Sequence, residues 1–375
     1  MTSGPRLNFP TLRSPAFDLA FIAAPGLLPL MLVLGLAAAG LEHAETPAWA
    51  FLLVVVGVDV AHVWSTLFRV YLDPVERRRR PWAYFGIPAA IAFVSLLLVA
   101  VEPLWFWRVL AYVAVHHFIK QQVGFVMLYR HAAGERDLTT RRLDQAAVWV
   151  GTAVPVLDWH TSPRAFHWFI EGDFAGPLDP AVMQLAWPLY GLTALLWLGS
   201  RLRGPRNPLK DLVMATTWAN WFVGIVLLDG DLIYTLTNVL LHGVPYLALV
   251  WHVTERRVHE PDLVAPLLSR LGGRAVTFLA LVLALAFAEE LLWDGLVWRE
   301  HGAWFLNAQD WLPSGETVTL LAIPLLSVPQ ATHYVLDGLI WRMDGSNPGL
   351  RSRLFSDAGP IRASSPPAPP APAPP

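Results

Sequence analysis

Long apolar stretches alternate with short polar segments along most of the chain. Because about 20 apolar residues in a helix cross the hydrocarbon core of a bilayer, each stretch predicts a membrane-spanning helix. The predicted helices cover residues 17–40, 48–72, 82–101, 103–130, 141–157, 180–200, 210–228, 231–254, 273–294 and 316–341. The pattern therefore predicts an all-α fold, a polytopic integral membrane helical bundle of about ten transmembrane helices.

Basic residues gather in every second polar segment. They occur within residues 77–80, 130–142, 201–210, 256–274 and 342–353, each after an even-numbered predicted helix, whereas the segments between are mostly acidic. Positively charged loops are retained on the cytoplasmic side of a membrane. The alternation predicts that both termini are cytoplasmic, and we expect a multi-pass protein integral to the bacterial inner (cytoplasmic) membrane.

The composition agrees with a membrane protein and narrows its chemistry. Of the 375 residues, 55% are hydrophobic and 15% are charged, against about 25% charged in soluble domains. The chain has no cysteine, so disulfides, thiolate metal sites and iron–sulfur clusters are excluded. Any metal ion must therefore be held by histidine, carboxylate or tyrosine side chains.

We predict a single multi-helix transmembrane domain over residues 1–355, because no fixed-period repeat divides them. For residues 356–375, which are rich in proline and alanine, we predict a disordered cytoplasmic tail. The first apolar run is too long for the hydrophobic region of a cleaved signal peptide. We therefore expect that run to form the first spanning helix.

Histidines occur inside four of the predicted helices, at a similar depth. His116 and His242 each lie 14 residues before an arginine of a basic segment, which is about 21 Å along a helix. Ionisable groups in hydrocarbon cost about 2.5–3.5 kcal/mol each and mark a function or a pair. The shared depth favours one metal site, with His62, His117, His242 and His333 as ligands.

Each of these histidines has a polar neighbour one helical turn away, which places both side chains on one face of the helix. The neighbours are Asp59, Gln121, Asn238 and Asp337. Such neighbours commonly fix the orientation of a metal-bound imidazole. The two aspartates can also offset the positive charge of a divalent ion.

Two further residues belong to the helix of His117. Adjacent helical residues point about 100° apart, so His116 is an alternative ligand to His117 rather than a second one. Lys120 lies too deep to reach the membrane surface easily, and we expect it to form an ion pair with Asp59 or Asp337.

The helices of the other histidines carry three more candidates. Tyr246 follows His242 by one turn, and Gln330 precedes His333 by three residues. His252 lies at the cytoplasmic end of its helix, where we expect an interfacial position. Besides a shared metal site, two alternatives account for the same residues: a proton or ion pathway, and scattered hydrogen bonds between helices.

Imidazole ligands suit zinc, copper, iron or nickel. Membrane haem sites use paired histidines about 13 or 14 residues apart on each of two helices, whereas His242 and His252 are ten apart and no second pair exists, so no haem is expected. The clustered histidine boxes of membrane fatty-acid desaturases are also missing from the sequence.

Four segments resemble the membrane-embedded β-carotene-cleaving dioxygenases of the Brp/Blh family. They are "VDVAHVW" with His62, "HHFIKQQVGF" with His117, "LLHGVPYLALVW" with His242 and "VPQATHYVLD" with His333, in the order of the family's motifs. The chain departs from the family by lacking the early Gly-Leu-Pro. It also has Tyr246 in place of the second histidine of an HxxxH pair, and its last histidine is displaced to His333.

The resemblance implies a non-haem iron(II) oxygenase, a dioxygenase whose apolar, lipid- or carotenoid-like substrate enters from the bilayer. It implies the four histidines as iron ligands with an open position for dioxygen, and Tyr246, Asp59 and Asp337 as catalytic candidates. Zinc and copper remain alternatives to iron. The expected partners are membrane lipids and the apolar small molecule, with no nucleic acid and with the oligomeric state open. A proton-coupled transporter or channel and a non-catalytic structural membrane protein are the alternative functions.

Overall fold

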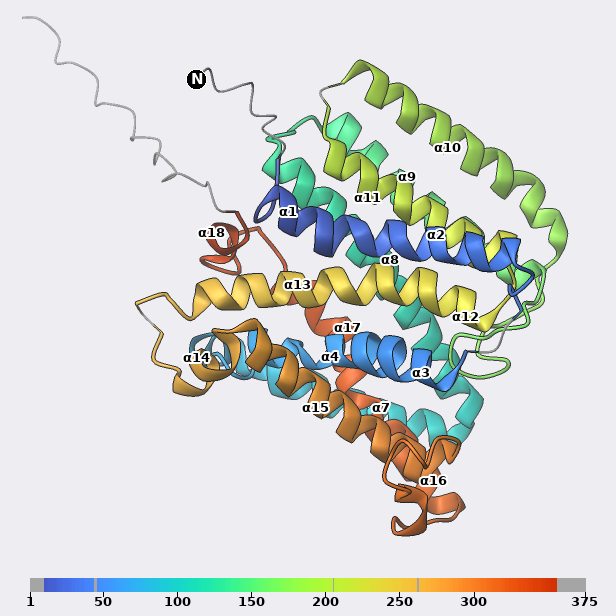
Figure 1. Cartoon of the computed structure of the whole chain (residues 1–375), viewed down its shortest axis with the longest axis vertical. Helices are drawn as coiled ribbons and strands as arrows, with labels where there is room; N and C mark the ends of the chain where they lie inside the picture. The colour runs from blue at the N-terminus through green and yellow to red at the C-terminus, as the bar shows by residue number, and fades with distance from the viewer. Residues whose placement is uncertain (1–9, 44–45, 205, 262, 356–375) are drawn as a thin grey trace, which may run out of the picture.

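The structure, a computed structural model, describes residues 10–43, 46–204, 206–261 and 263–355. In these ranges the chain is helical and contains no β-strand (Figure 1). The Pro/Ala-rich segment 356–375, for which a disordered tail is predicted, lies outside the described residues. The prediction of an all-α fold is confirmed for the part of the chain that is described.

Seven helical segments are long and apolar enough to cross a membrane, which indicates a multi-pass membrane protein. They are Pro15–Ala38, Ala48–Arg69, Pro81–Val101, Pro180–Arg203, Asp231–Arg257, Ala275–Trp298 and Glu316–Ile340. The first span consists of α1 (Pro15–Asp18), η1 (Leu19–Ala23) and α2 (Ala24–Ala38), the second of α3 (Ala48–Ala50), η2 (Phe51–Val60), α4 (Ala61–Trp64) and α5 (Thr66–Arg69), and the third of α7 (Pro81–Val101). The fourth consists of η3 (Pro180–Val182) and α10 (Met183–Arg203), and the fifth of α12 (Asp231–Tyr234), η5 (Thr235–Val239) and α13 (Leu240–Arg257). The sixth consists of α15 (Ala275–Trp293) and η6 (Asp294–Trp298), and the seventh of α16 (Glu316–Leu326) and α17 (Val328–Ile340).

The other three predicted spans are also helical, but they carry more polar residues and do not belong to these seven. They are α8 (Pro103–Ala132), α9 (Leu138–Thr161) and α11 (Pro208–Trp221), which η4 (Phe222–Leu227) extends. α8 packs against α7, α9, α11 and α17. The crossing of the membrane by these three helices stays a prediction.

Short helices gather at one end of the bundle, where the basic segments lie. α14 (Pro266–Gly272) and α18 (Leu350–Leu354) are at this end, and α3 and α12 are at the opposite end (Figure 1). The basic run 77–80 forms the last turn and the C-cap of α6 (Pro74–Arg79). We call this side of the molecule the basic end.

α13 runs through the centre of the bundle, and the span that contains it is the most buried of the seven. It packs against α2, η2, α4, α5 and α8. Gly243 permits one of these contacts, because a Cβ at this position would lie 2.5 Å from Val58 Cγ1. The missing side chain lets η2 and α13 approach closely, and each of the two spans carries a predicted ligand histidine just beyond this contact.

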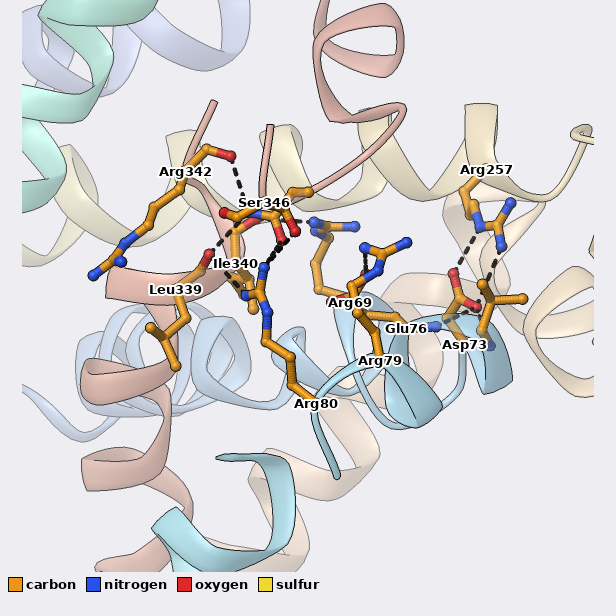
Figure 2. Close-up of polar contacts among 12 residues, drawn as sticks. Arg69, Asp73, Glu76, Arg79, Arg80, Arg257, Leu339, Ile340, Arg342 and Ser346 are labelled. Carbon is orange, nitrogen blue, oxygen red and sulfur yellow. Dashed lines mark hydrogen bonds and ion pairs between the residues drawn. The ribbon is translucent and has the colours of Figure 1, made fainter. Parts of the chain in front are cut away.

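Polar contacts tie the basic end together (Figure 2). Arg257 Nε lies 2.7 Å from Asp73 Oδ2, and Arg80 Nη2 donates to Asn347 Oδ1 at 3.0 Å. Burial raises the pKa of Asp73, but the hydrogen bond and charge of Arg257 outweigh it and hold that pKa below its usual range. These contacts join α6, α13 and the segment after α17, so they fix the ends of the helices that carry the predicted site.

Candidate metal centre

Four buried histidines from four separate helices meet inside the bundle. His62 comes from α4, His117 from α8, His242 from α13 and His333 from α17. One ring nitrogen from each lies within 4.8 Å of the others, and the four residues are between 0% and 4% exposed. We call these residues the histidine cluster. The set is the one that the shared depth along the helices predicts.

The cluster consists of two close pairs whose Nε2 atoms face each other. His62 Nε2 lies 3.1 Å from His242 Nε2, and His117 Nε2 lies 3.1 Å from His333 Nε2. Two nitrogens bound to one ion at about 2.0–2.1 Å would be roughly 3.0 Å apart at a right angle and roughly 3.4 Å apart at the tetrahedral angle. The observed spacing therefore fits four imidazoles around one metal ion. A hydrogen bond between neutral imidazoles would explain either pair alone, but not the convergence of both.

The nitrogens that point away from the centre have different partners. His333 Nδ1 lies 2.8 Å from Thr66 Oγ1, and His62 Nδ1 lies 3.6 Å from Asp59 Oδ1. His242 Nδ1 is buried and has no hydrogen-bond partner among the described residues. Thr66 was not among the predicted site residues, although its position one turn after His62 is a signal that could have found it.

Tyr246 and Asp337 form a hydrogen-bonded pair beside the cluster. Tyr246 Oη donates to Asp337 Oδ1 at 2.5 Å. Asp337 Oδ2 lies 4.0 Å from His117 Nε2, and Asp337 Oδ1 lies 3.7 Å from His333 Nδ1. These distances to the imidazoles are too long for hydrogen bonds. The carboxylate therefore hydrogen-bonds to the phenol and lies next to two of the imidazoles.

Arg69 and Trp341 complete this side of the site and were not predicted. Arg69 is 3% exposed, donates to the carbonyl of Ile340 at 3.1 Å and stacks 5.1 Å from the Trp341 ring centroid. A buried cation therefore lies against Trp341, whose Nε1 is 3.4 Å from Tyr246 Oη. The sequence offers one signal, since Arg69 lies seven residues after His62 and thus on nearly the same helix face.

The three amides that were predicted to orient the imidazoles support the site at a greater distance. Gln121 Nε2 donates to the backbone carbonyl of His242 at 2.8 Å. Gln330 Nε2 donates to Tyr334 Oη at 2.7 Å, and the Tyr334 ring lies 4.6 Å from that of His117. Asn238 bonds to Thr237 and to the carbonyl of Tyr234 within its own helix. Within the described chain, none of the three amides hydrogen-bonds to a cluster imidazole, because their donors go to these other partners.

Three further predictions concern charged or imidazole side chains outside the cluster. His116 and Lys120 are exposed, one turn apart on the outer face of α8. Lys120 forms no ion pair with Asp59 or Asp337 in the part of the chain that the structure describes, so the predicted ion pair is wrong. The helical rotation that turns His117 into the cluster leaves Lys120 exposed. The choice of His117 over His116 as the inward histidine agrees with this geometry.

His252, for which an interfacial position is predicted, is buried near the basic end of α13. It is 0% exposed, and its Nε2 lies 3.2 Å from the carbonyl oxygen of Leu354 in α18. The C-terminal segment folds over the end of α13 and covers the ring. His252 lies outside the histidine cluster.

Aromatic rings cover part of the cluster. Phe118 stacks on the His242 imidazole with centroids 3.7 Å apart and an interplanar angle of 7°. Trp168, from the segment between α9 and η3, packs edge-on against Phe118 at 5.2 Å. Because these rings are apolar, they exclude water from this side of the imidazoles.

A cavity of about 330 Å³ reaches the cluster from the surface of α8. His117, Tyr246, Tyr334 and Asp337 line its inner part, and Lys120, Gln145, Trp341, Arg342 and Met343 line the remainder together with apolar side chains of α8 and α13. Its volume is near the lower end of the roughly 300–1,000 Å³ typical of ligand pockets. The cavity connects a surface of the bundle with the side of the cluster occupied by Asp337.

Comparisons with known proteins do not place the chain in a family. No family model matches it, and no curated protein or solved structure matches it. The chemistry of the site is therefore argued from its own geometry.

Proposed function

We propose that the protein is a membrane-embedded, metal-dependent oxygenase, and specifically a non-haem iron dioxygenase for an apolar, unsaturated substrate. The observation that carries the proposal is the convergence of four buried imidazoles beside the Tyr246–Asp337 pair at the inner part of a cavity. Perturbed or ionisable groups gathered in a cavity are typical of reactive sites.

The four cluster histidines are the proposed ligands. Neutral imidazole binds iron, zinc and copper. Four protein ligands complete the tetrahedral shell of structural zinc, whereas an ion that takes six ligands keeps positions open for small molecules. Iron(II) is proposed because it has such positions, and when bound it would supply the activation of dioxygen.

The proposed reaction cleaves a carbon–carbon double bond with dioxygen: RCH=CHR′ + O2 → RCHO + R′CHO. The double bond and the O–O bond break, two C=O bonds form, and both oxygen atoms end in the products. The substrate supplies all the electrons, so no reductant or second protein is required. This balance suits a buried site that a cavity with a largely apolar lining reaches.

The residues around the cluster have separate proposed tasks. Tyr246 and Asp337 hold a proton between them and position the substrate at the inner part of the cavity. Phe118 and Trp168 keep water away, which limits side reactions of a reactive oxygen species. The positive charge of Arg69 is proposed to offset the negative charge of the Asp337 carboxylate.

The resemblance to the β-carotene-cleaving dioxygenases supports the same proposal. Its four segments contribute the four residues of the cluster, and Asp337 also comes from one of them. A common origin with a different substrate is part of the proposal, since Tyr246 takes the place of a motif histidine and hydrogen-bonds to Asp337.

We also propose that α8, α9 and α11 cross the membrane, so that ten helices span it and both termini are cytoplasmic. α8 has 30 residues, which is about 45 Å and longer than a bilayer core. Its polar residues are accounted for by the cluster and the cavity. The alternating basic segments support this topology in a bacterial inner membrane.

Elemental analysis of the detergent-purified protein tests the proposal. We expect about one iron per chain, lost when His62, His117, His242 or His333 is replaced by alanine. His116→Ala is the matched control, because His116 is adjacent to His117 but exposed, and it should keep its iron. A wild-type protein that contains no metal after growth in metal-replete medium would overturn the proposal, and stoichiometric zinc would redirect it to a structural or hydrolytic site.

A second measurement separates the enzyme from a proton-coupled transporter. In proteoliposomes, a relay through the histidines and aspartates would move protons across the membrane in metal-free protein. We expect no proton flux above that of empty liposomes. Flux that survives metal removal and is lost in His242→Ala would favour the transporter.

A further inference from the structure

We infer that the substrate carries an anionic headgroup, which Lys120 and Arg342 bind at the mouth of the cavity. The inference rests on the proposed function for the reaction and on the cavity for the substrate class. The ligand is a single-chain, unsaturated amphiphile with a carboxylate or a similar anion at one end. A carotenoid hydrocarbon lacks such a group.

Lys120 provides the first observation. It is exposed, lines the cavity and forms no hydrogen bond or ion pair with the described part of the chain. It lies ten residues before Arg130 on α8, about 15 Å from the basic end. A lysine at such a depth is costly in hydrocarbon and is expected to face a counter-charge. A bound anion would supply that charge.

Arg342 provides a second cation at the same mouth. It is exposed, lies two residues after the end of α17 and lines the cavity. Its Nε donates to the carbonyl of Gly338 at 2.6 Å, which holds the base of the side chain against the helix end. Two cations from two helices therefore border the opening. Asp337 is the one acidic residue that lines the cavity within the described chain, and it already accepts the Tyr246 hydrogen bond.

The remaining lining is suited to an apolar chain. Val123, Phe125, Met127, Leu128 and Leu249 contribute most of it. The cavity volume of about 330 Å³ suits one hydrocarbon chain better than the two chains of a phospholipid.

The spacing along the helices places the reacting bond near the headgroup. Lys120 lies three residues after His117 in α8, an axial distance of about 4.5 Å, and Arg342 lies five residues after Asp337, just beyond the end of α17. An anion held at the mouth therefore puts carbons a short distance along the chain next to the histidine cluster. Headgroup binding would select which double bond reaches the site.

Photo-crosslinking of the full-length protein in nanodiscs tests this inference. The probe is a monounsaturated fatty acid with a diazirine near its double bond, and the crosslinked residues are mapped by mass spectrometry. We expect labelling of cavity residues such as Tyr334. Oleate should compete at least 10-fold better than oleyl alcohol or β-carotene, which share the apolar chain but not the charge.

Substitutions test which cations select the headgroup. Lys120→Ala and Arg342→Ala should each reduce the preference for oleate over oleyl alcohol, and the double variant should abolish it. Lys120→Arg should retain it. Arg270→Ala is the control, because Arg270 is exposed on α14 and does not line the cavity. Equal competition by acid and alcohol in the wild type would overturn the inference, as would competition by phosphatidylglycerol but not by oleate.

The same assay on His333→Ala keeps the two proposals apart. Crosslinking does not need the metal, so the preference for oleate should persist in this variant. Iron in the wild type without any headgroup preference would overturn the substrate class and leave the oxygenase standing. A clear preference in a wild type that contains no metal would overturn the oxygenase and leave the anion site standing.

Discussion

Tyr246 donates a 2.5 Å hydrogen bond to Asp337 across the gap between α13 and α17. The two helices also carry His242 and His333, so this bond joins the backbones that supply half of the histidine cluster. Trp341 Nε1 lies 3.4 Å from the same phenol oxygen. The phenol is thus the polar link between the two helices on the cavity side of the imidazoles.

Tyr246→Phe should weaken this link without removing a proposed ligand. Leaving a buried carboxylate without its donor costs about 1–3 kcal/mol, so we expect a loss of stability of that size with the iron content unchanged. Denaturant unfolding and elemental analysis measure the two effects. Tyr190→Phe is the control, since the Tyr190 hydroxyl forms no hydrogen bond with the described residues. Loss of iron in Tyr246→Phe would mean that the phenol holds the metal site itself.

Thr66→Val should lower metal affinity. It removes the partner of His333 Nδ1 while keeping the shape of the side chain. Loss of a hydrogen bond to a metal-bound imidazole typically costs about 10–100-fold in affinity. Competition with a chelator of known affinity measures the change, and Thr66→Ser should restore most of it. An affinity equal to wild type in Thr66→Val would contradict a bound metal at His333.

Gly243→Ala should separate two of the proposed ligands. The added Cβ would lie 2.5 Å from Val58 Cγ1 and 3.2 Å from the Val58 carbonyl oxygen, so η2 must move away from α13. His62 would move with η2, while His242 would stay with α13. We therefore expect less iron per chain and a lower melting temperature. Gly191→Ala is the control, because nothing lies within 4 Å of its added Cβ. Full iron content in Gly243→Ala would show that the site tolerates this shift.

Asp73→Asn should change how stability depends on pH. Arg257 holds the pKa of Asp73 below its usual range despite burial, so the ionised form is favoured in the folded protein. This stabilisation is fully present above the unfolded pKa and is lost as the pH falls through the lower, folded pKa. Melting temperatures between pH 7 and pH 3 should fall less steeply in Asp73→Asn than in wild type. Parallel curves would show that the ion pair does not contribute. At pH 7 the variant should be less stable by about 3–5 kcal/mol, as for a broken buried pair.

The helices themselves follow from local patterns. Residues 231–254 are predicted as a span and are found within Asp231–Arg257, and residues 141–157 are found within α9, which continues through Pro155. Apolar runs form helices in a membrane because every backbone donor and acceptor must be satisfied within the segment. This requirement is local, so it can be recognised without knowing the neighbouring helices.

The site is predictable in part for the same reason. Depth depends on position along a helix, which is why His62, His117, His242 and His333 could be grouped from their distances to the basic segments. Lys120 was misassigned because a side chain on a helix can face the core or the surface at the same depth. The burial of His252 could not be predicted because the segment that covers it lies about 100 residues later in the chain.

Position along the chain is thus sufficient to predict the helices, the basic end and the shared depth of the four imidazoles. The rotation of each helix about its axis depends on packing between distant segments, such as the close contact of Gly243 with Val58. That rotation brings Thr66 to His333, joins Tyr246 to Asp337 and turns Lys120 and Arg342 toward one cavity. Because side-chain packing is short-ranged and joins residues far apart in the chain, these partners emerge only when the helices are assembled.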